Sequence, residues 1–341
     1  MDILVGPISG CYIANQLAAL DVLAGYGYKP DISMGASGGI VSILAFVSGN
    51  FTQIGLERVI SDLSSKDFVE TWVPLIPSYI IGFFQGSLYR HPSNDMEYIR
   101  NNISPGILMD NEIWIQTYDV ENEKTNLYCT LREGESKLYI DPDRYTEMGV
   151  NKPRFISGDM NMYCKAAKAT ASIPTVLPPV IIGTENHVDG GIAYSSPIIP
   201  LSKSIKELES VHIIYIIGSN IYTDDDIVKK KQNPSIIDMG SVIVKYLLKS
   251  HITQDRITGY NIVSTTCDDI EESDISIEDY FKRRSEWKSS FLEIYPSETA
   301  ILPLFDFEGR DLVKMYKEQK NKLKFKVRYV PKNLAPKCVG N

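Results

Sequence analysis

The segment Gly-Ala-Ser-Gly-Gly at residues 35–39 is the feature that most restricts how this chain can fold. It follows an apolar run at residues 32–34 that is typical of a short strand, and an apolar helical pattern follows it to residue 47. In such a strand–turn–helix the serine stands at a sharp bend, and the glycines let strand and helix pack closely. The segment therefore predicts a nucleophilic Ser37, with a tight βα turn without chemistry as the alternative.

The order of elements around this turn predicts a parallel sheet. An apolar strand at residues 2–5 precedes a helix whose apolar residues recur at helical spacing until Gly25, and the strand at 32–34 comes next. Strand, helix, strand and helix in this order are typical of an α/β fold with helices on both faces of the sheet. The continuous apolar run at residues 211–217 predicts a further strand that is buried on both faces.

The remaining elements follow from the same patterns. We expect paired strands at 113–117 and 126–131, a helix at 160–171 with Asp159 as its N-cap, a hairpin of 180–182 with 187–188, and helices at 236–253 and 277–288. The chain has no internal repeat and no convincing linker, so we predict a single domain over residues 1–341. Residues 64–111 hold an apolar stretch rich in aromatic side chains, which predicts an inserted cap or lid over that domain or, alternatively, ordinary core beneath a long insertion.

A second motif, Asp189-Gly190-Gly191, contains the one acidic residue that we consider as a partner for Ser37. An aspartate before two glycines is often only a turn residue. The functional alternative is a carboxylate held on a glycine-rich loop, close enough to accept the proton of the Ser37 hydroxyl. The two residues lie 152 positions apart, so only the fold can bring them together.

Taken together, these segments resemble the patatin-like phospholipase family. The resemblance rests on residues 12–20, on residues 25–31 leading to Ser37, and on residues 171–179 leading to Asp189. It implies a three-layer α/β fold and hydrolysis of phospholipid or other lipid acyl esters by a Ser–Asp dyad, with no metal or other cofactor. Ser37 would be the nucleophile and Asp189 the base. The glycines that match the family's motifs are Gly10, Gly35, Gly39, Gly190 and Gly191.

The loop at residues 6–10 departs from the family's pattern, which is a run of glycines followed by a basic residue and another glycine. Pro7 has no N–H to donate, and Ser9 stands where Arg or Lys is usual. We expect the backbone N–H groups of Gly6, Ile8 and Gly38 to stabilise the oxyanion, with Pro7 fixing the backbone so that the Ile8 N–H points there. The alternatives are a slow enzyme, or a catalytically dead scaffold that serves as a binding protein.

Three histidines raise the alternative of a Ser–His–Asp esterase. His187 lies two residues before Asp189, a separation from which an aspartate does not easily orient a histidine toward Ser37. His212 and His251 lie downstream of Asp189, as the order Ser, Asp, His of α/β-hydrolases requires. His212 begins a predicted strand and His251 ends a predicted helix, so we expect structural roles for both.

Charge and cysteine usage indicate partners and location. The chain carries 35 Lys and Arg against 43 Asp and Glu, a net charge of −8, which argues against a nucleic-acid binder. The basic C-terminal stretch, residues 314–341, has a net charge of +8; with the cap it suggests peripheral membrane contact, and a solvated surface is the alternative. Five scattered cysteines, no basic leader and no apolar span of about 18 residues favour a cytoplasmic protein. No histidine stands in a ligand cluster, so we expect no metal site.

Overall fold

The computed structural model describes most of the chain. The described residues are 1–62, 87, 89–91, 101, 103–140, 145, 148–174, 176–219, 236–264, 270–298 and 308–332. Most of the predicted cap, residues 64–111, lies outside the described residues, as does the end of the basic C-terminal stretch. The elements below therefore refer to the described part of the chain.

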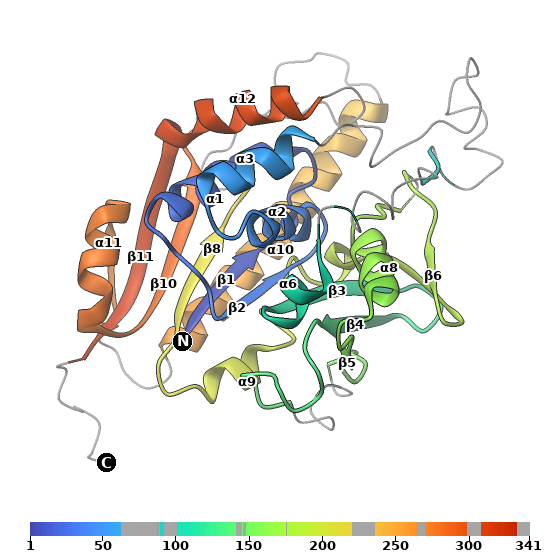
Figure 1. The fold of residues 1–341 in the computed structure, drawn as a ribbon, viewed down its shortest axis with the longest axis horizontal. Helices are drawn as coiled ribbons and strands as arrows, with labels where there is room; N and C mark the ends of the chain where they lie inside the picture. Colours follow the sequence, from blue (N-terminus) through green and yellow to red (C-terminus); the bar gives the residue numbers. More distant parts are fainter. Residues whose placement is uncertain are drawn as a thin grey trace.

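A twisted sheet of parallel strands forms the centre of the molecule, as the sequence predicts (Figure 1). In spatial order its parallel strands are β3 (Glu112–Asp119), β2 (Ile32–Gly35), β1 (Asp2–Gly6), β8 (His212–Ile216) and β10 (Trp287–Pro296). β1 lies in the middle, with Ile3 opposite both Ile32 of β2 and Ile213 of β8. The fold is thus of the α/β class.

Further strands extend the sheet on both sides. Beyond β10 lie the antiparallel strands β11 (Leu323–Pro331) and β9 (Glu271–Asp274). Beyond β3 lie β4 (Lys124–Cys129), which is antiparallel to it, and β5 (Arg154–Phe155). The predicted hairpin is present as β6 (Val180–Ile182) and β7 (Glu185–Asp189), and β7 also pairs with the end of β3.

Helices cover both faces of the sheet and complete three layers. The apolar core on one face includes side chains of four helices, α1 (Ile13–Gly25), α2 (Gly38–Ser48), α3 (Gln53–Ser61) and α12 (Gly309–Gln319). The core on the other face includes α10 (Ile236–Val263) and the region of α9 (Ser202–Lys206). Side chains alternate between these two cores along β1, because successive strand residues point to opposite faces. The helix predicted at 160–171 is α8 (Met160–Thr170), capped by the Asp159 carboxylate.

One predicted helix is wrong in its second half. Helix α11 covers Ile277–Arg283, and a single 3-10 turn leads to β10, which begins at Trp287. From Trp287 onward large apolar side chains are buried between β8 and β11, and this tertiary pairing determines the strand. Helix α12 and β11, near the C-terminus, were not predicted as separate elements.

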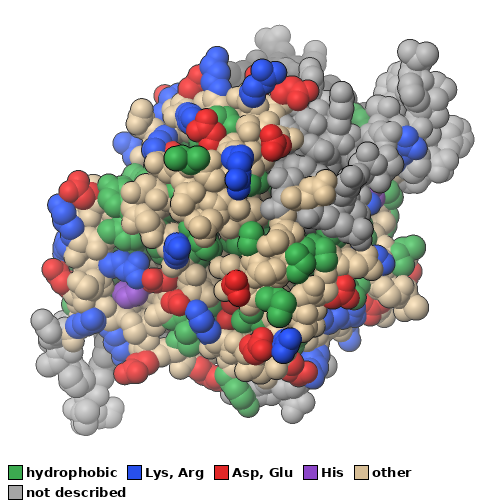
Figure 2. Space-filling model, in the orientation of Figure 1, with side chains coloured by type: hydrophobic (Ala, Val, Ile, Leu, Met, Phe, Trp, Pro, Cys, Tyr) green, Lys and Arg blue, Asp and Glu red, His purple; other side chains and the backbone are tan. Residues whose placement is uncertain are grey.

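The described part of the basic stretch, residues 314–332, belongs to the fold through α12 and β11. Many of its cations form ion pairs with acidic side chains. These pairs are Lys317–Glu57, Lys320–Asp21, Lys322–Glu298, Lys326–Glu272 and Arg328–Glu272. Figure 2 likewise shows basic and acidic side chains interspersed over the visible face. The stretch therefore presents less unbalanced positive charge than its sequence indicates.

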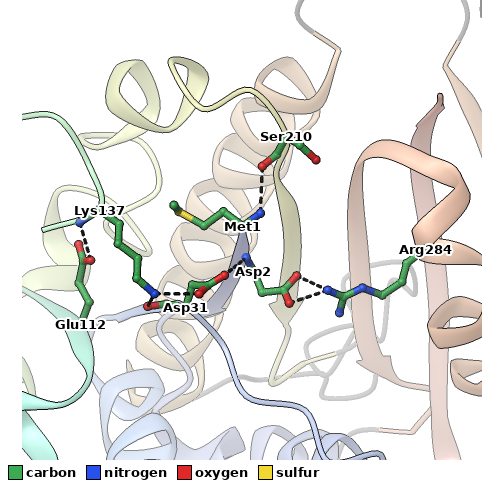
Figure 3. A network of polar contacts seen from close by, with 7 residues as sticks. All are labelled: Met1, Asp2, Asp31, Glu112, Lys137, Ser210 and Arg284. Atoms are coloured by element: carbon green, nitrogen blue, oxygen red, sulfur yellow. Dashed lines mark hydrogen bonds and ion pairs between the residues drawn. The ribbon is translucent and has the colours of Figure 1, made fainter.

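A polar network joins the N-terminal ends of the central strands, at the opposite end of β1 from α2 (Figures 1 and 3). The Met1 ammonium donates to the Ser210 carbonyl at 3.1 Å, and the Asp2 N–H donates to the Asp31 carboxylate at 2.8 Å. The Asp2 carboxylate accepts hydrogen bonds from Arg284, at the end of α11. The network thus ties β1 to the turn before β2 and to the start of β10.

We predict that Gly259→Ala destabilises the protein, because α10 packs there directly against β10. A Cβ at this position would overlap the fully buried ring of Phe291. The overlap should lower the free energy of unfolding by about 1–3 kcal/mol, although alanine is favoured over glycine in a helix by about 1 kcal/mol. Urea unfolding measures the change. The control is Ile257→Ala, on the same helix and 53% exposed, which should change stability little; equal stabilities for the two variants would contradict this packing.

Candidate active site

Ser37 lies at a strained turn between β2 and α2. β2 ends at Gly35, α2 begins at Gly38, and Ser37 between them has φ 53° and ψ −137°. Residues other than glycine rarely have a positive φ, and the resulting backbone strain, roughly 1–3 kcal/mol, is concentrated at functional sites. The Ser37 N–H donates to the Thr170 hydroxyl at 2.9 Å, so the end of α8 holds the turn in place. Sequence reasoning missed Thr170.

Glycines allow the turn to approach the first strand. A Cβ on Gly39 would overlap the backbone carbonyls of Gly6 and Pro7. Helix α2 therefore begins in direct backbone contact with the loop after β1. The predicted close packing of strand and helix is present, and it includes the loop after β1.

The register of β3 brings Asp189 to Ser37. The first half of β3 pairs with β2, where Ile115 lies opposite Gly35, the last residue of β2. The second half pairs with the antiparallel β7, where Thr117 lies opposite Asp189. β7 thus occupies the edge of β3 that β2 leaves open when the chain turns into the Ser37 elbow. The two sequence motifs meet there.

The Asp189 carboxylate is buried and hydrogen-bonded. The carboxylate accepts a hydrogen bond from the Gly191 N–H at 2.8 Å, and the backbone N–H of Asp189 donates to the Ser172 carbonyl at 3.0 Å. Burial raises the pKa of the Asp189 carboxyl to about 6, while hydrogen bonds from the Ser37 side chain and the Gly191 N–H act to lower it. Ser37 is 5% exposed and Asp189 6%, so the hydroxyl and the carboxylate interact in an environment with little water.

The loop after β1 is fixed by bonds that differ from the expectation. The Ile8 N–H donates to the Ser195 carbonyl at 2.8 Å, so in this structure it is already used. The Pro7 carbonyl accepts the Gln16 amide of α1 at 2.8 Å, and Gly10 turns the chain with φ 49°. Gly38 is the first residue of α2, so its N–H has no carbonyl in a preceding helical turn to bond with. Of the three expected donors, Ile8 is thus bonded to Ser195, while Gly6 ends β1 and pairs with Gly35 of β2.

The three candidate histidines occupy different places. His187 is fully buried with one ring nitrogen 3.0 Å from the Thr117 hydroxyl and the other 3.1 Å from the Glu185 carboxylate, and burial lowers its pKa. His212 lies opposite Asp2 at the N-terminal end of β8, far along the strands from the Ser37 elbow, and burial lowers its pKa to about 4. The ring of His251, on α10, lies 3.0 Å from the Gly191 carbonyl oxygen. Of the three histidines, His251 is thus the one whose ring contacts the loop that follows Asp189, at the Gly191 carbonyl.

Asp255 is a buried carboxylate that sequence reasoning missed. It lies on α10, is fully buried, and accepts hydrogen bonds from the hydroxyls of Ser195, Ser196 and Tyr215. Burial raises the pKa of its carboxyl to about 7, against the lowering effect of these hydrogen bonds. Because the Ser195 carbonyl accepts the Ile8 N–H, Asp255 is linked through Ser195 to the loop after β1. An aspartate in an amphipathic helix gives no sequence signal of such burial.

Within the ranges that the structure describes, no group of three or more His, Cys, Asp or Glu side chains could hold a metal ion. Over the same ranges, no helix is both long and apolar enough to cross a membrane.

Fold and site together define an α/β protein with a serine at a strained strand-to-helix turn, facing a buried aspartate. The chain belongs to the patatin-like phospholipase family, because the sequence model of that family matches residues 10–202. This range includes Ser37 and Asp189 and begins after the Pro7 loop. The family is one of lipid acyl hydrolases, so membership suggests this class of activity.

A solved structure is similar over most of the chain. It is the crystal structure of VipD from Legionella pneumophila, at 8% sequence identity and a TM-score of 0.35, covering 95% of this chain and 67% of that chain. A comparison with curated proteins found no match.

We predict that acidification stabilises the fold through Asp255. Its folded-state pKa, about 7, lies above the ordinary value of 3.8, so the stabilisation is complete below about pH 4 and is lost as pH rises through 7. Each proton involved changes the free energy of unfolding by about 1.4 kcal/mol per pH unit. Urea unfolding of the wild type and of Asp255→Asn between pH 5 and 8 isolates this contribution, because the opposite effect of the lowered His187 and His212 pKa values is common to both proteins. The wild-type free energy of unfolding should fall with pH up to about 7 relative to that of Asp255→Asn. An unchanged slope in a folded Asp255→Asn protein would contradict the buried carboxyl.

Proposed function

We propose that this protein is a lipid acyl hydrolase in which Ser37 and Asp189 form a catalytic dyad. The observation that carries the proposal is the interaction of the Ser37 hydroxyl with the buried Asp189 carboxylate. The strained turn that holds Ser37 and the end of β7 that holds Asp189 meet because β2 and β7 pair along one edge of β3. Phospholipids or other lipid esters are the substrates that the family implies.

In the proposed reaction, Asp189 accepts the Ser37 proton as the Ser37 oxygen attacks the ester carbonyl. The resulting oxyanion accepts hydrogen bonds from backbone N–H groups, of which that of Gly38 begins α2 and gains from the helix dipole. When the tetrahedral intermediate collapses, the bond to the leaving alcohol breaks and protonated Asp189 returns its proton to that alcohol. Asp189 then takes a proton from water, whose oxygen attacks the acyl-enzyme to form a second tetrahedral intermediate. When that intermediate collapses, its bond to the Ser37 oxygen breaks, Asp189 returns the proton to that oxygen, and the fatty acid is released.

No histidine takes part in this reaction. His187 is held by Thr117 and Glu185, and His212 lies at the other end of the sheet. His251 contacts the backbone of the Asp189 loop, so in this proposal it positions the loop. A Ser–His–Asp esterase that uses His251 is the second candidate, because His251 alone among the three adjoins that loop.

Peripheral membrane contact and a cytoplasmic location stay predictions. The ion pairs of α12 and β11 weaken the electrostatic part of the membrane argument, since paired surface charges attract an anionic bilayer less than free ones. Because these elements also belong to the sheet and its helical layer, truncation at residue 314 would remove part of the fold.

We predict that Ser37→Ala and Asp189→Asn each abolish hydrolysis of a short-chain nitrophenyl ester and of phospholipid in vesicles. His212→Asn should keep most of the activity, as should His251→Asn if it positions the loop. A fluorophosphonate probe should label the wild type and leave Ser37→Ala unlabelled. A folded His251→Asn protein as inactive as Ser37→Ala would replace the dyad by a triad. No labelling of the wild type at Ser37 would favour a catalytically dead scaffold.

We also predict that activity falls as pH decreases through about 6. Asp189 acts as a base only when ionised, and burial raises its pKa to about 6. The profile of kcat/KM for the soluble ester should therefore lose about tenfold per pH unit well below that value. A profile that stays flat from pH 7 to 4.5 in folded protein would contradict Asp189 as the base.

A further inference from the structure

The loop after β1 contains a buried hydroxyl that no hydrogen bond uses. Ser9 is 1% exposed, and its Oγ has no partner among the described residues. A buried polar group without a partner is unfavourable in the free protein, so its presence requires an explanation. One explanation is that its partner arrives during the reaction.

Packing places this hydroxyl at the start of α2. A Cβ on Gly38 would overlap the Ser9 Oγ, and the same position lies 3.0 Å from the backbone nitrogen of Gly10. From the other side, a Cβ on Gly218, just beyond β8, would stand 3.0 Å from the Ser9 Cβ. The Ser9 side chain is thus held between the end of β8 and the residue that follows Ser37.

The loop also offers few of the donors that an oxyanion needs. Pro7 has no N–H, and the Ile8 N–H is used by the Ser195 carbonyl. An oxyanion hole built only from backbone N–H groups of this loop would therefore lack the donors at positions 7 and 8. The buried Ser9 hydroxyl, next to these positions, is a side-chain donor that could replace one of them.

We propose that the Ser9 hydroxyl is a side-chain oxyanion donor that acts together with the Gly38 N–H. The inference rests on the proposed Ser37 chemistry. A serine hydroxyl can rotate about its C–O bond and carries one proton to donate. Because it has no partner among the described residues of the free protein and would gain one when negative charge develops on the ester oxygen, its interaction stabilises the transition state more than the ground state.

The test compares Ser9→Ala with Ser48→Ala in the full-length protein. Ser48 is also buried with an unpartnered hydroxyl, but it lies at the other end of α2. Ser9→Ala should lower kcat on the soluble ester by at least tenfold, with little change in KM and without lowering the melting temperature. Ser48→Ala should keep wild-type kcat. Ser9→Cys preserves the shape of the side chain with a weak donor, so its kcat should also fall.

An alkylboronic acid, which forms a tetrahedral anionic adduct with a serine, provides a second measurement. Its inhibition constant should rise about tenfold in Ser9→Ala and stay unchanged in Ser48→Ala. A folded Ser9→Ala protein with wild-type kcat and wild-type boronate inhibition overturns the role of Ser9 while leaving the dyad in place. Wild-type activity no higher than that of Ser37→Ala overturns the proposed function, and the role of Ser9 with it.

Discussion

The pairing of β3 with two different partners along one edge is the constraint on which the candidate site depends. Its first half pairs with β2 in parallel and its second half pairs with β7 in antiparallel, so the ends of β2 and of β7 meet along this edge. The chain leaves β2 through the strained Ser37 turn, and β7 ends with Asp189 beside it. A slip of one residue in the pairing of β7 with β3 would turn Asp189 to the other face of the sheet.

Burial gives both buried aspartates their properties. A carboxylate in surroundings with little water keeps its proton to a higher pH, which makes Asp189 a stronger base and Asp255 a pH-dependent element of stability. The two are linked through the loop after β1, since Asp255 holds Ser195 and Ser195 holds Ile8. The fold thus accepts two destabilising buried acids, and the resulting network fixes the backbone around Ser37.

Local patterns in the sequence were sufficient for the first part of the fold. Residues 2–48 alternate strand and helix with glycine turns, and each pattern agrees with its tertiary surroundings, so the predicted elements are present. The region after Ile277 shows the limit. Its helical spacing continues past Arg283, but the apolar side chains from Trp287 onward find partners on β8 and β11, and sheet pairing overrides local propensity there.

The sequence by itself determined the α/β class, the Ser37 turn and the presence of a glycine-flanked Asp189, because each depends on residues close together in the chain. Only the tertiary structure decided that the two residues meet, that the Ile8 N–H bonds with Ser195, that His251 adjoins the Asp189 loop, and that Asp255 and the Ser9 hydroxyl are buried. These features depend on contacts between segments up to two hundred residues apart. Such contacts are set by strand register and helix packing, which leave no local pattern in the sequence.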